Sequence, residues 1–137
     1  MIFETNKDKG RAGLALGIAY FGANGYVVNM PLNDTQWYDF VVEKDGQFST
    51  VQCKATGSAD NSISLISMGG TKGETYDSVL NHPIDYLFCI DKDQHLFLIP
   101  FASLQAAGNT KSITLRTEPS KYANKSSFDT SQYQVTL

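Results

Sequence analysis

The chain has 137 residues, of which 42% are hydrophobic and 18% are charged, with a formal net charge of −3. This composition is typical of a globular chain and excludes intrinsic disorder, and the length predicts one domain over residues 1–137. The acidic balance argues against a protein that binds nucleic acid through one large basic surface, although it leaves room for a locally basic cleft.

No apolar run reaches the roughly 18–20 residues needed to cross a bilayer, which predicts a protein without a membrane partner. The N-terminal residues lack the charged-then-apolar layout of a signal peptide. Cys53 and Cys89 lie in strand-like apolar runs and lack the spacing of metal ligands. We therefore expect a cytoplasmic protein with reduced thiols.

The first predicted element is a helix over about residues 7–23, capped by Thr5 or Asn6. Gly13 and Gly17 leave a narrow surface where this helix can approach a sheet closely. Apolar residues at helical spacing form its buried stripe, namely Leu14, Ile18 and Phe21, widened by Leu16 and Tyr20.

Strand-like segments follow the helix along most of the remaining chain. Strands are predicted at residues 26–30, 62–67, 84–90, 96–99 and 113–115, with a loop at 68–74 and a short helical turn at 100–107. Residues 118–137 show no clear periodicity. This order indicates an α/β (α+β) fold with a central mixed sheet.

The segment around Asp45-Gly46 has two β-like runs about a strong hairpin signal. If these two residues form the loop, the numbers of facing residues sum to 91, as for 45 and 46 themselves. Asp39 then lies opposite Gln52, and Trp37 opposite Lys54, with facing Cβ atoms roughly 5 Å apart. An acid, an amide and an amine converge at one end of the hairpin.

These side chains suit a divalent cation such as Mg²⁺ or Mn²⁺, which prefers oxygen ligands. The carboxylate of Asp39, the side-chain oxygen of Gln52 and the backbone carbonyl of Cys53 would supply three. Lys54 would hold the attacking water or neutralise a phosphate. The pattern indicates metal-assisted phosphodiester hydrolysis, although a solvated Asp–Lys pair is the commoner arrangement on spacing alone.

Short runs of sequence resemble the PD-(D/E)xK nucleases over roughly two-thirds of the chain. The resemblance is to a subgroup with a group I intron-encoded homing endonuclease, related to Holliday-junction resolvase-like proteins. The runs are Asn6-Lys7-Asp8-Lys9-Gly10, Asn24-Gly25-Tyr26-Val27-Val28, Pro31-Leu32, Tyr38-Asp39-Phe40-Val41-Val42, Val51-Gln52-Cys53-Lys54, Ile84-Asp85-Tyr86-Leu87-Phe88 and Leu96-Phe97-Leu98-Ile99-Pro100.

The resemblance implies a restriction-endonuclease-like core, with helices flanking the sheet and the active site on its second and third strands. It implies a Mg²⁺- or Mn²⁺-dependent endodeoxyribonuclease of homing, resolvase or phage type. Asp39, Gln52 and Lys54 would be catalytic, with Gln52 as the subgroup's familiar replacement for an acid. DNA would be the partner, and cutting both strands implies a homo-oligomer, either a dimer or a tetramer.

One departure from the family concerns an acid that usually follows the glycine corresponding to Gly10 by one or four positions. Arg11 and Leu14 occupy those positions here. A catalytically silent nuclease fold, acting as a DNA-binding or inhibitor-like protein-binding module, is therefore the alternative. Arg11 and Lys72 are candidate DNA-phosphate contacts, with a plain surface role as the competing interpretation.

Three aromatic residues have simpler expected roles. Trp37, which has the ring to stack on a base, is expected to pack against the helix instead. His82 and His95 have no partner at the spacing of metal ligands or of a catalytic triad. Both are expected to be ordinary surface histidines.

Overall fold

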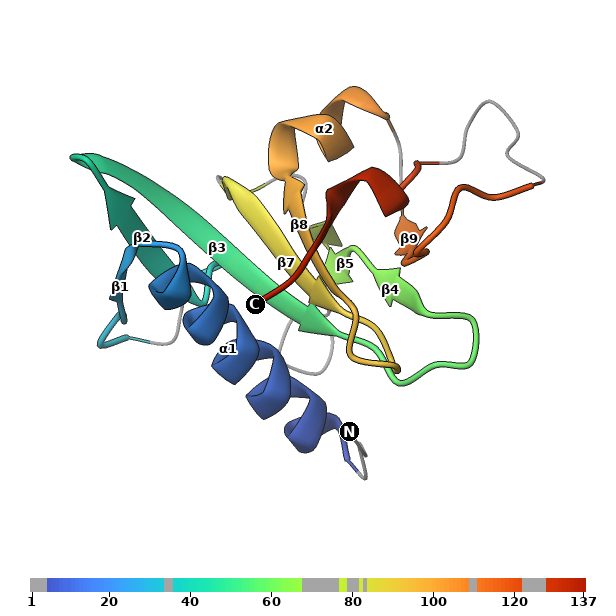
Figure 1. The fold of residues 1–137 in the computed structure, drawn as a ribbon, viewed down its shortest axis with the longest axis horizontal. Helices are drawn as coiled ribbons and strands as arrows, with labels where there is room; N and C mark the ends of the chain where they lie inside the picture. Colours follow the sequence, from blue (N-terminus) through green and yellow to red (C-terminus); the bar gives the residue numbers. More distant parts are fainter. Residues whose placement is uncertain are drawn as a thin grey trace.

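A six-stranded mixed sheet forms the centre of the fold in the computed structural model (Figure 1). The structure describes residues 5–33, 36–67, 77–78, 82, 84–108, 111–121 and 128–137. The strand order is β1-β2-β3-β7-β8-β10, in which β3 and β7 run parallel and the other pairs are antiparallel. The bounds are β1 Val27–Asn29, β2 Phe40–Lys44, β3 Gln47–Ala55, β7 Tyr86–Ile90, β8 Leu96–Pro100 and β10 Gln134–Val135.

Helix α1 (Asn6–Ala23) lies against β3. Thr5 caps it: its hydroxyl accepts the backbone N–H of Asp8, and the Asp8 carboxylate accepts the N–H of Thr5. A Cβ added to Gly17 would lie 2.8 Å from the Sγ of Cys53. The predicted helix, cap and close glycine approach are therefore confirmed.

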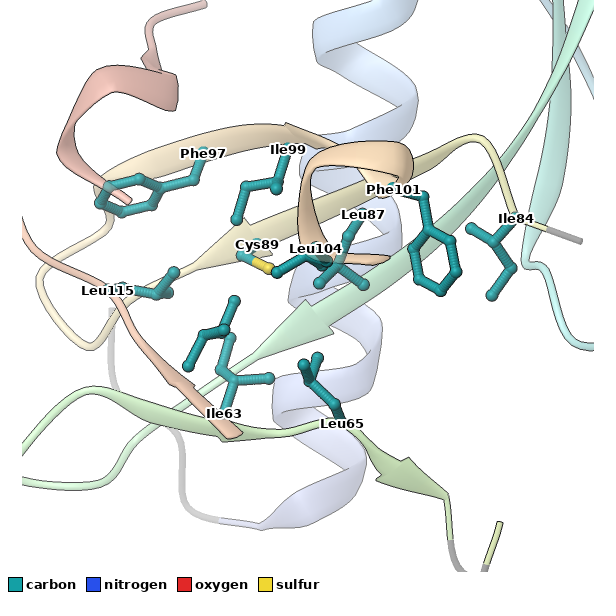
Figure 2. Packing of buried hydrophobic residues seen from close by; sticks show 11 residues of the cluster. Ile63, Leu65, Ile84, Leu87, Cys89, Phe97, Ile99, Phe101, Leu104 and Leu115 are labelled. Carbon is teal, nitrogen blue, oxygen red and sulfur yellow. The ribbon is translucent and has the colours of Figure 1, made fainter. Parts of the chain in front are cut away.

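Apolar side chains fill both faces of the sheet because residues alternate along each strand. On the face that carries α1, one buried cluster contains Phe21, Phe40, Val42, Val51, Phe88, Ile90 and Leu96. The other face carries a second cluster (Figure 2), formed by Ile63, Leu65, Ile84, Leu87, Cys89, Phe97, Ile99, Phe101, Leu104, Ile113 and Leu115. We call this second group the distal cluster, since it lies on the side of the sheet away from α1.

Short elements cover the distal cluster. They are α2 (Phe101–Ala106) and the antiparallel pair of β4 (Ser62–Ser64) and β9 (Ser112–Thr114). A second pair joins β5 (Ile66–Ser67) to β6 (Asp77–Ser78). The predicted strand 62–67 is thus divided between two small sheets, whereas the helical turn within 100–107 is confirmed.

The C-terminal segment contributes to the main sheet although its sequence shows no periodicity. A 3₁₀ turn over Ser131–Tyr133 leads into β10, whose two residues pair with β8 at the sheet edge. A two-residue strand is too short to leave an alternating pattern. In the part of the chain that the structure describes, no helix has the length and apolarity to cross a membrane.

Candidate active site

The β2–β3 hairpin has the predicted register. Five residue pairs join the strands, from Lys44 with Gln47 to Phe40 with Val51. Asp45 and Gly46 both have positive φ, at 53° and 79°, as a two-residue hairpin loop requires.

Asp39 lies immediately before β2 and is bonded twice to β3. Its backbone N–H donates to the carbonyl of Val51 at 2.8 Å, and its Oδ2 accepts the backbone N–H of Cys53 at 2.6 Å. The strand ladder ends at the pair of Phe40 and Val51, three pairs before the predicted pair of Trp37 and Lys54. As a result, the carboxylate lies beside the peptide that joins Gln52 to Cys53.

Gln52 and Lys54 lie on the sheet face opposite α1, since Val51 and Cys53 between them pack on the α1 side. Both side chains are half-buried. The Nε2 of Gln52 lies 3.4 Å from the carbonyl oxygen of Cys53. The Gln52 carboxamide thus donates to the carbonyl of Cys53, the residue whose N–H the Asp39 carboxylate accepts.

Burial raises the pKa of Asp39 above its ordinary value of 3.8. The hydrogen bond from Cys53 and the positive charge of Lys54 oppose this rise. The hydrogen bond and the charge of Lys54 therefore offset only part of the burial penalty on the charged carboxylate. A cation beside the carboxylate would favour its charged form. An oxygen-only donor set with a desolvated carboxylate fits a hard divalent ion such as Mg²⁺ or Mn²⁺.

The two thiols do not fit a role as metal ligands. Burial raises the pKa of both Cys53 and Cys89, so the thiolate form that binds metals is disfavoured. Of Cys53, the backbone carbonyl alone is available to the site.

Helix α1 contributes no free acid. Its one acidic residue, Asp8, closes the capping box with Thr5 and also pairs with Arg11. The Arg11 side chain is 77% exposed, and Leu14 packs against the cluster on the α1 side. Lys72, the other predicted DNA contact, lies outside the described residues.

Trp37 does not lie opposite Lys54, and it does not pack against α1. Its ring packs against the distal cluster and stacks on His82, with ring centroids 3.4 Å apart and an interplanar angle of 12°. The predictions of an isolated His82 and of packing between Trp37 and α1 are wrong. The ring therefore lies on the sheet face away from α1, the same face toward which Gln52 and Lys54 point.

His95 also has a partner that sequence spacing did not suggest. Its Nδ1 lies 2.8 Å from the Oδ2 of Asp91, whose Oδ1 accepts the backbone N–H groups of Asp93 and His95. Within the described ranges, Asp91, Asp93 and His95 form the one group of acidic and histidine side chains whose ligand atoms lie within 4.8 Å of one another. Both carboxylate oxygens of Asp91 are thus engaged by groups of the turn between β7 and β8. The expectation of a His95 without a partner is wrong.

An α1 helix packed on a mixed sheet, with an Asp, a Gln and a Lys gathered at one hairpin end, defines a restriction-endonuclease-like fold. The chain belongs to the PD-(D/E)XK endonuclease family, whose sequence profile matches residues 4–136. Both the predicted family and the predicted fold class are therefore confirmed.

Among solved structures, the chain is similar to "The structure of a bacterial homing endonuclease: I-Ssp6803I". The TM-score is 0.74 at 18% sequence identity, over 95% of this chain and 88% of the other. At this identity the likeness establishes the fold. No curated protein matches the sequence.

Proposed function

We propose that the protein is a divalent-metal-dependent DNA endonuclease that hydrolyses phosphodiester bonds. Its active site would contain Asp39, Gln52 and Lys54. One observation carries this assignment. The partly buried carboxylate of Asp39 is bonded to β3 at the peptide between Gln52 and Cys53, next to the cation of Lys54. Membership of the PD-(D/E)XK endonuclease family supports it.

Mg²⁺ or Mn²⁺ would be held by the Asp39 carboxylate, the Gln52 side-chain oxygen and the Cys53 carbonyl. When bound, such an ion supplies stabilisation for the negative charge that develops on the phosphate. The protein's own contribution is to fix the Asp39 carboxylate beside the peptide of Cys53 before the ion arrives, through the hydrogen bond from the Cys53 N–H.

Lys54 is the proposed water-orienting and phosphate-neutralising residue. Its positive charge lowers the pKa of Asp39 against the effect of burial, which supports its assignment to the same site. An ammonium in this place attracts the phosphate, and its N–H groups orient the attacking water.

The proposed substrate is DNA, handled in the manner of a homing, resolvase or phage endonuclease. The structural likeness to a bacterial homing endonuclease supports the first of these. Because the described residues of each chain supply one such site, cutting both strands of a duplex calls for a dimer or a tetramer, which light scattering would measure.

Incubation with plasmid, linear and branched DNA in the presence of Mg²⁺ or Mn²⁺ tests this function. Wild-type protein should cleave, and Asp39→Ala and Lys54→Ala should abolish cleavage with circular dichroism unchanged. Lys44→Ala, which removes a lysine from the same hairpin outside the site, is the matched control and should cleave normally. Cleavage that survives both site substitutions would remove the assignment.

A catalytically silent module is the second candidate, favoured by one observation. The only acid of α1 is committed to the helix cap, which leaves Asp39 as the single carboxylate among the proposed ligands. Wild-type protein that shifts DNA in a gel, yet leaves it intact in Mg²⁺ and in Mn²⁺, would support this candidate.

A further inference from the structure

The position of Asp39 depends on more than the hairpin, because Asp39 lies outside the strand ladder. On its C-terminal side it is followed directly by β2, and two hydrogen bonds tie it to β3. On its N-terminal side, residues 36–38 have no regular secondary structure. Whatever fixes those three residues therefore also fixes the approach of Asp39 to the site.

Trp37 is the anchor on that side. Its ring packs against the distal cluster, and the imidazole of His82 lies flat on it at a centroid distance of 3.4 Å. The carbonyl of His82 accepts the backbone N–H of Ile84 at 2.9 Å, and Ile84 is a buried member of the same cluster. The stack is thus joined to the core through the ring of Trp37 and through the backbone of His82.

The segment does not fully satisfy its own polar groups. The Oε1 of Gln36 is buried and, among the residues described, has no hydrogen-bond partner. An unpaired buried acceptor disfavours the folded arrangement of a segment. The packing of the neighbouring Trp37 ring on the distal cluster opposes this cost.

We propose that His82 is a positioning residue for the candidate metal site, acting through Trp37 to hold Asp39 beside Cys53. This inference rests on the proposed function only in taking Asp39 as a metal ligand. His82 would touch neither the ion nor the DNA. It would instead restrict the segment before β2 to the arrangement in which the carboxylate meets β3.

The chain contains a single tryptophan, so its fluorescence reports on this stack without a label. Removing the imidazole in His82→Ala should change the emission of Trp37. Calorimetric titration with Mn²⁺ should then show binding weakened by about threefold to tenfold, the scale of one aromatic pair. His82→Phe, which keeps a flat ring, should restore wild-type affinity.

Two further variants separate stacking from other effects. His82→Leu fills a similar volume without an aromatic ring and should weaken Mn²⁺ binding as His82→Ala does. It keeps the test available if His82→Ala folds poorly. His95→Gln removes the other histidine, at the turn between β7 and β8, and should bind Mn²⁺ as the wild type does.

Wild-type Mn²⁺ affinity in folded His82→Leu or His82→Ala, with altered Trp37 emission, would overturn the inference. Failure of His82→Phe to restore affinity would also overturn it. Unchanged Mn²⁺ binding in Asp39→Ala would instead contradict the proposed metal site itself. The two failures are therefore distinguishable in one set of titrations.

Discussion

The carboxylate of Asp39 accepts the backbone N–H of Cys53 at 2.6 Å, across the start of the β2–β3 hairpin. This bond fixes a charged group that burial disfavours, at the part of β3 where Gln52 and Lys54 face away from α1. Perturbed carboxylates concentrate at active sites, which agrees with the proposed role of Asp39.

Asp39→Asn should keep or raise the stability of the protein while removing metal binding. The amide can still accept from Cys53 but carries no charge to desolvate. Because the folded-state pKa of Asp39 is raised, ionisation disfavours folding at neutral pH, and this penalty disappears as the pH falls through the raised pKa towards 3.8. Urea unfolding at several pH values should show the gain at pH 7 and its loss in acid.

Asp39→Ala is the comparison that isolates the hydrogen bond. It leaves the N–H of Cys53 without its acceptor and should cost about 1–3 kcal/mol of unfolding free energy relative to Asp39→Asn. Equal stability of the two variants would show that the bond contributes little.

Gln52→Glu should tighten divalent-metal binding, because it adds a negative charge to the proposed ligand set. A unit charge about 4 Å from a divalent ion is worth about 2 kcal/mol even in water, which corresponds to roughly thirtyfold in affinity. Mn²⁺ calorimetry would measure it. Unchanged or weaker binding would place the Gln52 side chain outside the ion's coordination.

Gly17→Ala should destabilise the protein although alanine favours helices. The new Cβ would lie 2.8 Å from the Sγ of Cys53 and 3.3 Å from the Cζ of Phe40. Overpacking of this kind costs about 1–3 kcal/mol, against a helix-propensity gain of about 1 kcal/mol. Urea unfolding measures the net change in unfolding free energy.

Gly10→Ala is the matched control for this substitution, since nothing lies within 4 Å of its added Cβ. It should be neutral or stabilising. Cys53→Ala in the Gly17→Ala background should recover part of the loss, because it removes the nearest atom. A Gly17→Ala protein as stable as Gly10→Ala would contradict the close packing of α1 on β3.

Asp91→Ala should lower the unfolding free energy by about 2–3 kcal/mol, since two backbone N–H groups and the His95 ring lose their acceptor. Metal affinity at the candidate site should not change. Thermal unfolding and Mn²⁺ calorimetry together check both expectations. A loss of Mn²⁺ binding with little loss of stability would make the turn, rather than the hairpin, the metal site.

Local rules in the sequence were sufficient for much of the fold. The Thr5 cap, the glycine approach of α1 and the Asp45-Gly46 loop all depend on neighbouring residues, and all three were predicted correctly. The two-residue β10 could not be predicted, because its place is decided by pairing with β8 at the sheet edge.

The hairpin register was predictable from Lys44–Gln47 to Phe40–Val51, but not for the three predicted pairs beyond it. The hairpin register placed Asp39, Gln52 and Lys54 together, but the shift that sends the Asp39 carboxylate to Cys53 depends on where the preceding chain is anchored. That anchor is the stack of Trp37 on His82, two residues 45 positions apart (82 − 37) that no local pattern connects. Long-range packing of this kind leaves no signal in a single sequence.

The most direct test of the central claim is a crystal structure of the protein soaked in Mn²⁺, read by its anomalous signal. The predicted result is a peak coordinated by the Asp39 carboxylate, the Gln52 side-chain oxygen and the Cys53 carbonyl. A site left empty at saturating Mn²⁺, or a peak only at the turn of Asp91 and His95, would contradict the account.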